Sequence, residues 1–174
     1  NPSLEKFSVK TYDVIEAELE IVKPHNKKIE CSVFGFSGET PIEGIEGDIV
    51  YIENADSILL PETMGWIGLA SQRPSKEHWK KLIGKASGLV IVENTPYREL
   101  SRVAIPYEWR EKMGSLPSVY VRYMDAYELL STGKVKMKVD QTYRDVEASN
   151  IFATIEGYKY PDEIVYVTAH YDSV

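Results

Sequence analysis

A histidine and an aspartate near the C-terminal end are the residues whose types and spacing could bind a metal. The apolar run 164–169 leads directly into His170, and Asp172 follows two positions later. Residues two apart in an extended backbone point to the same side, so an imidazole on a metal and a carboxylate on its other ring nitrogen can act together. The pattern predicts a metal ligand at His170 supported by Asp172, with an ordinary strand-end histidine as the alternative.

The elements expected to position this pair are two apolar strands, at 150–155 and 163–169. Ligands of open α/β sheets gather where strands end at their carboxyl edge, which is where the second strand would place His170. An isolated hairpin is marginally stable in water. We therefore expect both strands to belong to a larger sheet that this chain begins and does not complete.

Length and composition bound the function classes. The 174 residues carry a net charge of −7, with no basic face for phosphate binding, so the sequence argues against a nucleic-acid partner. Cys31 is the sole cysteine, so a metal site must use His, Asp or Glu. No apolar stretch approaches the ~20 residues of a membrane span. The first residue is Asn1 and not methionine, so an upstream signal or anchor could have been removed. An extracellular or membrane-anchored parent protein is therefore one of the alternatives.

Residue periodicity predicts an alternation of strands with few helices. Val135, Met137 and Val139 alternate with lysines, which is typical of a strand with one buried face. A helix is predicted after the N-cap Ser75, running through Ala86 to a stop at Gly88. A shorter helix is predicted at 125–130, and a long surface excursion at 94–117. Further strands are predicted at 17–21, 29–34, 44–53, 66–69, 89–92 and 118–123.

The excursion contains a group of tyrosine, tryptophan and arginine side chains, the types that interfaces favour. These aromatic side chains either cover the domain's own core or form an interaction surface, and the sequence favours neither interpretation over the other. The candidate interaction surface consists of Tyr97, Arg98, Arg102, Tyr107, Trp109 and Arg110.

Other chemical readings are weaker. His25 lies in a turn and His78 on the charged side of a predicted helix, so solvated roles are favoured for both. The acidic loop 39–48 lacks the spacing of a calcium-binding loop. Ser173 beside His170 is too close in sequence to form a hydrolase triad.

Three segments, 148–157, 161–165 and 170–174, resemble the start of the catalytic domain in zinc-dependent aminopeptidases. These are di-zinc exopeptidases related to bacterial leucyl aminopeptidase, glutamate carboxypeptidase and the transferrin-receptor ectodomain. The resemblance implies that His170 is the first zinc ligand and that Asp172 is the carboxylate supporting it. The other ligands and the glutamate general base would lie beyond residue 174.

The middle of the chain resembles the protease-associated (PA) domain that such peptidases carry as an insertion. The residues that carry this resemblance are 44–52, 85–94, 116–121 and 129–133. The resemblance implies a mixed, β-rich α/β fold with a β-barrel-like or sandwich-like core, flanking short helices and the first strands of a truncated catalytic domain. The implied domains are a lead-in at 1–25, the PA domain at 26–140 and the start of the peptidase domain at 141–174.

The expected function is that of the accessory domain and first zinc-ligand segment of an aminopeptidase that removes N-terminal residues from peptides. Its partners would be peptide substrates and the rest of the catalytic domain. The 174-residue chain itself is expected to lack peptidase activity and a tight zinc site, because one histidine leaves most coordination positions to water. The alternative is a non-catalytic peptide- or protein-binding module of a receptor-like relative.

Overall fold

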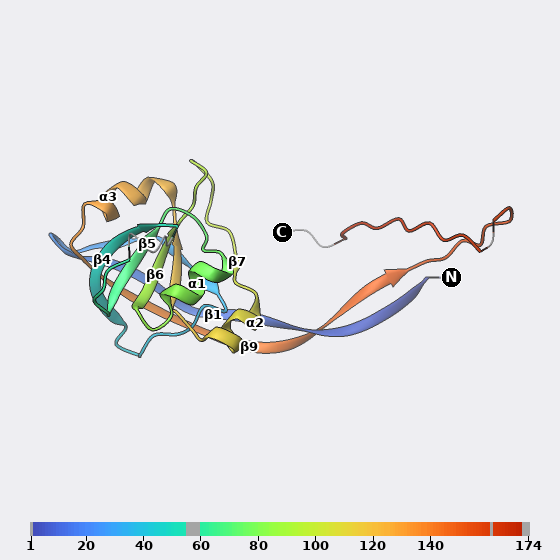
Figure 1. Ribbon diagram of the computed structural model, residues 1–174, viewed down its shortest axis with the longest axis horizontal. Coiled ribbons are helices and arrows are strands. Elements are labelled where there is room, and N and C mark those ends of the chain that lie inside the picture. The colour runs from blue at the N-terminus through green and yellow to red at the C-terminus, as the bar shows by residue number, and fades with distance from the viewer. Residues whose placement is uncertain (1, 55–59, 161, 172–174) are drawn as a thin grey trace. The chain divides into compact units, whose positions relative to one another are not determined.

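The structure, a computed structural model, describes residues 2–54, 60–160 and 162–171. The chain divides into two compact units, one made of Lys10–Arg144 and the other of Asn1–Val9 with Asp145–Val174. Strands β1 and β9, the first and last, pass from one unit into the other (Figure 1). The domain limits expected at residues 25 and 140 stay predictions.

The described strands form one sheet in the order β2-β1-β9-β4-β5-β6-β8-β3-β7. Its central strands β4, β5, β6 and β8 run parallel to one another, whereas β9 and β3 flank them in the antiparallel sense. The strands are β1 (Ser3–Lys23), β2 (Lys27–Ile29), β3 (Cys31–Gly35), β4 (Ile45–Glu53), β5 (Trp66–Ala70), β6 (Ala86–Val92), β7 (Val103–Ala104), β8 (Ser118–Val121) and β9 (Lys134–Phe152).

Both faces of β5, β6 and β8 are buried. In β6, Leu89 and Ile91 belong to one apolar cluster, while Val90 and Val92 belong to another on the opposite face. Near-continuous apolar runs such as this are typical of parallel strands covered on both sides. The sequence has therefore placed two layers of core around one sheet.

Different elements cover the two faces (Figure 1). Helices α1 (Lys76–Leu82) and α2 (Tyr107–Met113) pack on the first cluster. The second cluster contains residues of β1, β2 and β9 as well as of the central strands, so the sheet folds over its own face there, and α3 (Ala126–Leu130) adds Leu129. A 3₁₀ turn, η2 (Tyr123–Asp125), precedes α3. The expected mixed, β-rich α/β fold is confirmed.

Helix α1 begins as predicted and ends earlier. The Ser75 hydroxyl accepts a hydrogen bond from the His78 amide at 3.3 Å, which satisfies one of the free N–H groups of the first turn. The helix ends at Leu82, and Gly84 follows with φ +77°, so the predicted stop at Gly88 is wrong. Gly88 lies inside β6, where an added Cβ would come within 2.8 Å of Ile45 Cδ1.

Two other predictions fail. The surface excursion at 94–117 holds helix α2, strand β7 and the buried side chains of Val103, Ile105 and Leu116. The strand expected at 163–169 is not formed, and the strand expected at 150–155 ends with β9 at Phe152. Residues 163–169 have no strand partner in the described structure, and β-branched residues form strands only where a ladder and a packing surface are present.

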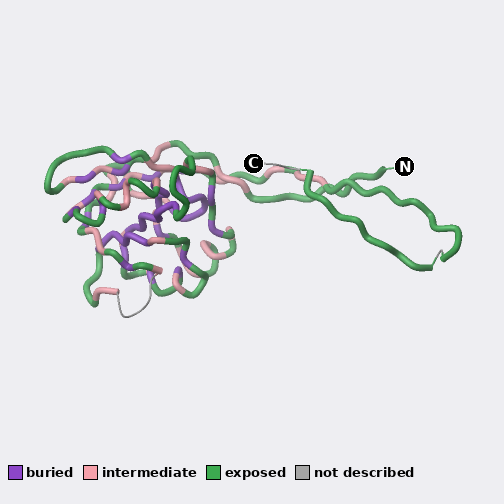
Figure 2. The backbone as a smooth tube through the Cα atoms, turned by 90° about the horizontal axis from the view of Figure 1, so that it is seen from above, coloured by how far each residue is buried: buried purple, intermediate pink, exposed green. Residues whose placement is uncertain are grey.

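Buried residues are concentrated in the Lys10–Arg144 unit, while 153–160 and 162–171 are exposed throughout (Figure 2). Ile164, Val165, Tyr166 and Val167 have exposed fractions of 73%, 88%, 82% and 93%. Of the helices that the structure describes, none has the length and apolar character needed to span a membrane.

Candidate functional site

The predicted metal ligand lies in the exposed C-terminal segment. His170 is solvent-exposed and follows the irregular run 163–169. Its neighbour Tyr171 donates a hydrogen bond from its hydroxyl to the carbonyl oxygen of Ser149 at 2.7 Å, which ties this end of the segment to β9. Asp172 lies outside the described residues, so its expected support of His170 stays a prediction.

A zinc site needs about three protein ligands around one ion. Across the described ranges, no group of three or more His, Cys, Asp or Glu side chains is arranged to hold a metal. The residues described here therefore do not fit a zinc centre on their own, and His170 contributes at most one ligand to a site completed by other residues.

The candidate interaction surface is divided between two environments. Tyr97 is 92% exposed and adopts φ +63°, and Arg98 and Arg102 are also exposed. Tyr107 and Trp109, in contrast, are half-buried and pack against the first apolar cluster. An interaction role remains a prediction for all of them, but Tyr107 and Trp109 also serve the core.

Arg110 completes a polar network between α2 and β9. Its guanidinium donates to the Tyr143 hydroxyl at 2.7 Å and to Glu39 at 3.0 Å, and the Tyr143 hydroxyl donates in turn to Glu39. Burial and the hydrogen bond to Glu39 raise the pKa of Tyr143. With every partner satisfied inside the molecule, this network fixes α2 and leaves little capacity for a ligand.

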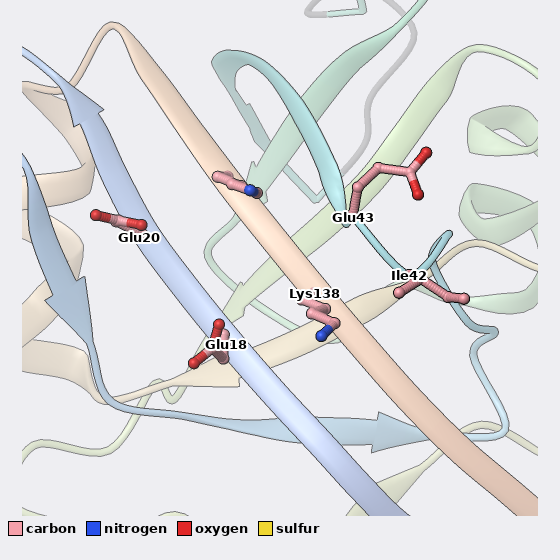
Figure 3. A pocket seen from close by; sticks show the side chains of 6 residues that line it. Glu18, Glu20, Ile42, Glu43 and Lys138 are labelled. Carbon is pink, nitrogen blue, oxygen red and sulfur yellow. The ribbon is translucent and has the colours of Figure 1, made fainter.

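A shallow charged pocket of about 210 Å³ lies on the outer strands (Figure 3). Glu18 and Glu20 of β1 and Lys138 of β9 face it, with Glu43 on the neighbouring loop. Glu18 is paired with Lys28 at 2.9 Å, and Lys138 with Glu16 at 2.6 Å. These are solvated ion pairs across a sheet surface, which contribute little and do not define a ligand.

A different pocket lies at the carboxyl ends of the parallel strands. Its volume is about 380 Å³, and its lining contains the buried carboxylate of Glu93 together with Arg73, Arg98 and Tyr120. Sequence reasoning overlooked this group. The sequence pattern that could have predicted this pocket is the presence of polar residues directly after the predicted strands 66–69 and 89–92. This is the edge where α/β sheets bind ligands.

Comparison with known proteins places these features in context. No family model matches the sequence. Human (Homo sapiens) Carboxypeptidase Q is 22% identical over an alignment of 210 positions, which covers 98% of this chain and 40% of that protein.

Solved structures show the same fold. A Peptidase M28 precursor from Shewanella amazonensis SB2B superimposes with a TM-score of 0.75 at 17% identity, over 95% of this chain and 43% of its own. The aminopeptidase from Aneurinibacillus sp. strain AM-1 superimposes with a TM-score of 0.69 at 15% identity, over 91% of this chain and 39% of its own. BSAP, a zinc aminopeptidase from Bacillus subtilis, superimposes with a TM-score of 0.64 at 14% identity, over 87% of this chain and 36% of its own.

The chain thus spans about two-fifths of the length of the proteins it matches. The resemblance noted in the sequence is confirmed at the level of fold: the chain has the fold of part of an M28 peptidase of the zinc aminopeptidase type.

Proposed function

We propose that this chain is the PA domain and first zinc-ligand segment of a di-zinc aminopeptidase that removes N-terminal residues from peptides. The observation that carries the proposal is the coverage of the comparisons: nearly the whole chain superimposes on a Peptidase M28 precursor, but on only 43% of that protein. An activity shared with such proteins would therefore need residues from the other part.

The surface of the C-terminal unit supports this division. The apolar run before His170 is exposed at every described position, and large exposed apolar surface is typical of an interface with further protein. The grouping of Asn1–Val9 with Asp145–Val174 also supports the proposal, since both ends of the chain would then belong to the peptidase domain and enclose the PA domain. The proposed partner of this surface is the rest of the catalytic domain.

The proposal gives His170 the role of a zinc ligand and Asp172 that of its supporting carboxylate. In the 174-residue chain the described residues supply no zinc site, so we expect neither aminoacyl-substrate hydrolysis nor stoichiometric zinc binding. Isothermal titration with Zn²⁺ tests the second point directly, and micromolar or tighter binding by this chain would contradict it.

A second test uses the proposed parent peptidase, of which this chain would be one part. Hydrolysis of an aminoacyl anilide should be abolished by a chelator, restored by Zn²⁺ and lost in His170→Ala, while His78→Ala, in helix α1 of the other unit, should leave it unchanged. A receptor-like, non-catalytic module is the second candidate. It would be favoured by a longer protein that binds peptides yet shows no hydrolysis at any zinc concentration.

A further inference from the structure

The pocket at the carboxyl ends of β5, β6 and β8 is built on a rigid frame. The register pairs Ala70 of β5 with Ile91 of β6, and Val92 of β6 with Val121 of β8, so the three strands end side by side. The Glu93 amide continues the ladder by donating to the Val121 carbonyl at 2.8 Å. The segments that line the pocket therefore leave the sheet from fixed positions.

The carboxylate of Glu93 is the electrostatic centre of this pocket, and the protein already satisfies it. The side chain is 1% exposed; one carboxylate oxygen accepts from the Thr95 amide at 3.0 Å and the other from the Tyr120 hydroxyl at 2.8 Å. Arg98 Nε lies 4.0 Å from the second oxygen. Glu93 thus orients its neighbours and is not available as the principal acceptor for a ligand.

The remaining polar groups of the lining are mainly donors. Arg73 lies over the ring of Tyr120 with its guanidinium carbon 5.5 Å from the centroid and its N–H groups beside the Tyr120 hydroxyl, and no ion pair joins it to a carboxylate of the described residues. Arg98 approaches Glu93 no closer than 4.0 Å, from Nε, which is beyond hydrogen-bond distance, so its N–H donors are not used by that carboxylate. Asn94 uses its side-chain oxygen to accept from Thr95, so its amide NH₂ also remains. Gln72 completes the polar lining.

We propose that this pocket binds a carboxylate group, such as the side chain or terminus of an acidic peptide, between Arg73 and Arg98. Guanidinium groups match a planar carboxylate through paired N–H donors. Two arginines and one buried glutamate give the pocket a net charge of +1, which one carboxylate neutralises. A dianionic phosphate would leave excess negative charge beside Glu93, so the charge balance favours the carboxylate. The site involves no metal and is independent of the peptidase role proposed above.

Binding can be measured on the 174-residue chain by amide chemical-shift titration at low ionic strength, because exposed guanidinium–carboxylate contacts are screened by salt. The probes are N-acetyl-glutamate amide for a side-chain carboxylate, N-acetyl-alanine for a terminal one, inorganic phosphate, and N-acetyl-glutamine amide as the neutral isostere. Saturable shifts centred on Glu93, Asn94 and Arg98 with either carboxylate, and none with the isostere, are expected. Tighter binding of phosphate than of both carboxylates would overturn the assignment.

Variants localise the contact. Arg73→Gln should weaken carboxylate binding about five- to tenfold, as expected for one lost charge-assisted contact. Arg144→Gln removes an exposed arginine outside the pocket and outside the candidate interaction surface, and should leave the affinity unchanged. Equal weakening in both variants would mean that general surface charge causes the effect. An unchanged affinity in Arg73→Gln would mean that Arg73 does not contact the carboxylate. Either result contradicts the proposal.

Discussion

Glu93 is the one charged side chain that is fully buried among the described residues, and its partners explain how it is tolerated. Burial alone would raise the pKa of Glu93, but the hydrogen bonds from Tyr120 and Thr95 and the nearby Arg98 outweigh burial and hold it below its ordinary value. Conversely, burial and the hydrogen bond to Glu93 raise the pKa of Tyr120. The pair stabilises the end of β6 against the end of β8.

Replacing Tyr120 by Phe should therefore destabilise the Lys10–Arg144 unit by about 1–3 kcal/mol, the cost of leaving a buried acceptor without a donor. Denaturant unfolding at pH 7 measures the change. Tyr127→Phe is the matched control, because Tyr127 is 84% exposed. A loss of the same size in both variants would show that the hydroxyl of Tyr120 contributes nothing specific.

The same pair predicts a pH dependence. Since the folded pKa of Glu93 lies below that of the unfolded chain, its stabilisation is present above about pH 4.3, the ordinary glutamate pKa, and is lost as pH falls through the folded pKa. Tyr120→Phe removes a donor to the carboxylate, so the folded pKa should rise and the dependence become smaller. Unfolding measured between pH 3 and 6 should show the two free-energy curves converging in acid, and parallel curves would contradict the argument.

Cys31 provides a second prediction for a single residue. Burial, with the nearby carboxylates of Glu18 and Glu30, raises the pKa of its thiol to about 12. Relative to an ordinary thiol with a pKa of about 8.5, the reactive thiolate at neutral pH is scarcer by about three orders of magnitude. Labelling with a disulfide reagent should be slow in the native protein and fast in denaturant. A Tyr158→Cys variant, whose new thiol replaces a side chain that is 97% exposed, should react fast in both.

At the level of elements, the sequence predicted what local patterns control. The alternation at Val135, Met137 and Val139 predicted a half-buried strand, and all three side chains are fully buried in β9. The N-cap at Ser75 predicted the start of α1. The end of α1 was misplaced because two glycines have different roles: Gly84 supplies the positive φ after the helix, whereas Gly88 supplies space inside β6.

Long-range contacts explain what the sequence could not predict. Helix α2 has no buried residue of its own and is held by contacts of Tyr107, Trp109 and Arg110 with distant segments, which no local pattern encodes. Glu93 looked like an ordinary residue after a strand, because its partners lie on another strand and in the next turn. The metal ligand set could not be predicted in full, since the described residues offer a single predicted ligand.

The parallel strands also predict where a methyl group cannot be added. A Cβ on Gly68 of β5 would lie 2.9 Å from Ile52, 3.0 Å from Leu89 and 3.2 Å from Trp66, all at side-chain atoms of the first cluster. Gly68→Ala should cost about 1–3 kcal/mol through overpacking, measured by denaturant unfolding. At Gly133 an added Cβ meets nothing within 4 Å, so Gly133→Ala should be near neutral. Equal effects would show that the first cluster absorbs the methyl group.

At the level of the whole molecule, stability and the proposed catalytic contribution are assigned to different parts of the chain. Both apolar clusters draw their members from residues between Tyr12 and Tyr143, inside the Lys10–Arg144 unit. The other unit holds the predicted ligand His170 and exposes large apolar side chains, including Ile155, Ile164 and Val167. A segment of this kind adds little to folding and much to association.

Residues 10–144 alone should therefore fold cooperatively, with a thermal midpoint close to that of the 174-residue chain. The hydrophobic dye ANS should bind less to the shorter chain, because the exposed apolar segment is gone. A chain ending at Phe152 separates the contributions: it keeps all of β9 and should already show most of the fall in dye binding. Loss of cooperative unfolding in the chain that ends at Phe152 would mean that residues 153–174 contribute to the core. In that case the apolar run before His170 would be covered within this chain and would not form an interface with another part of the peptidase.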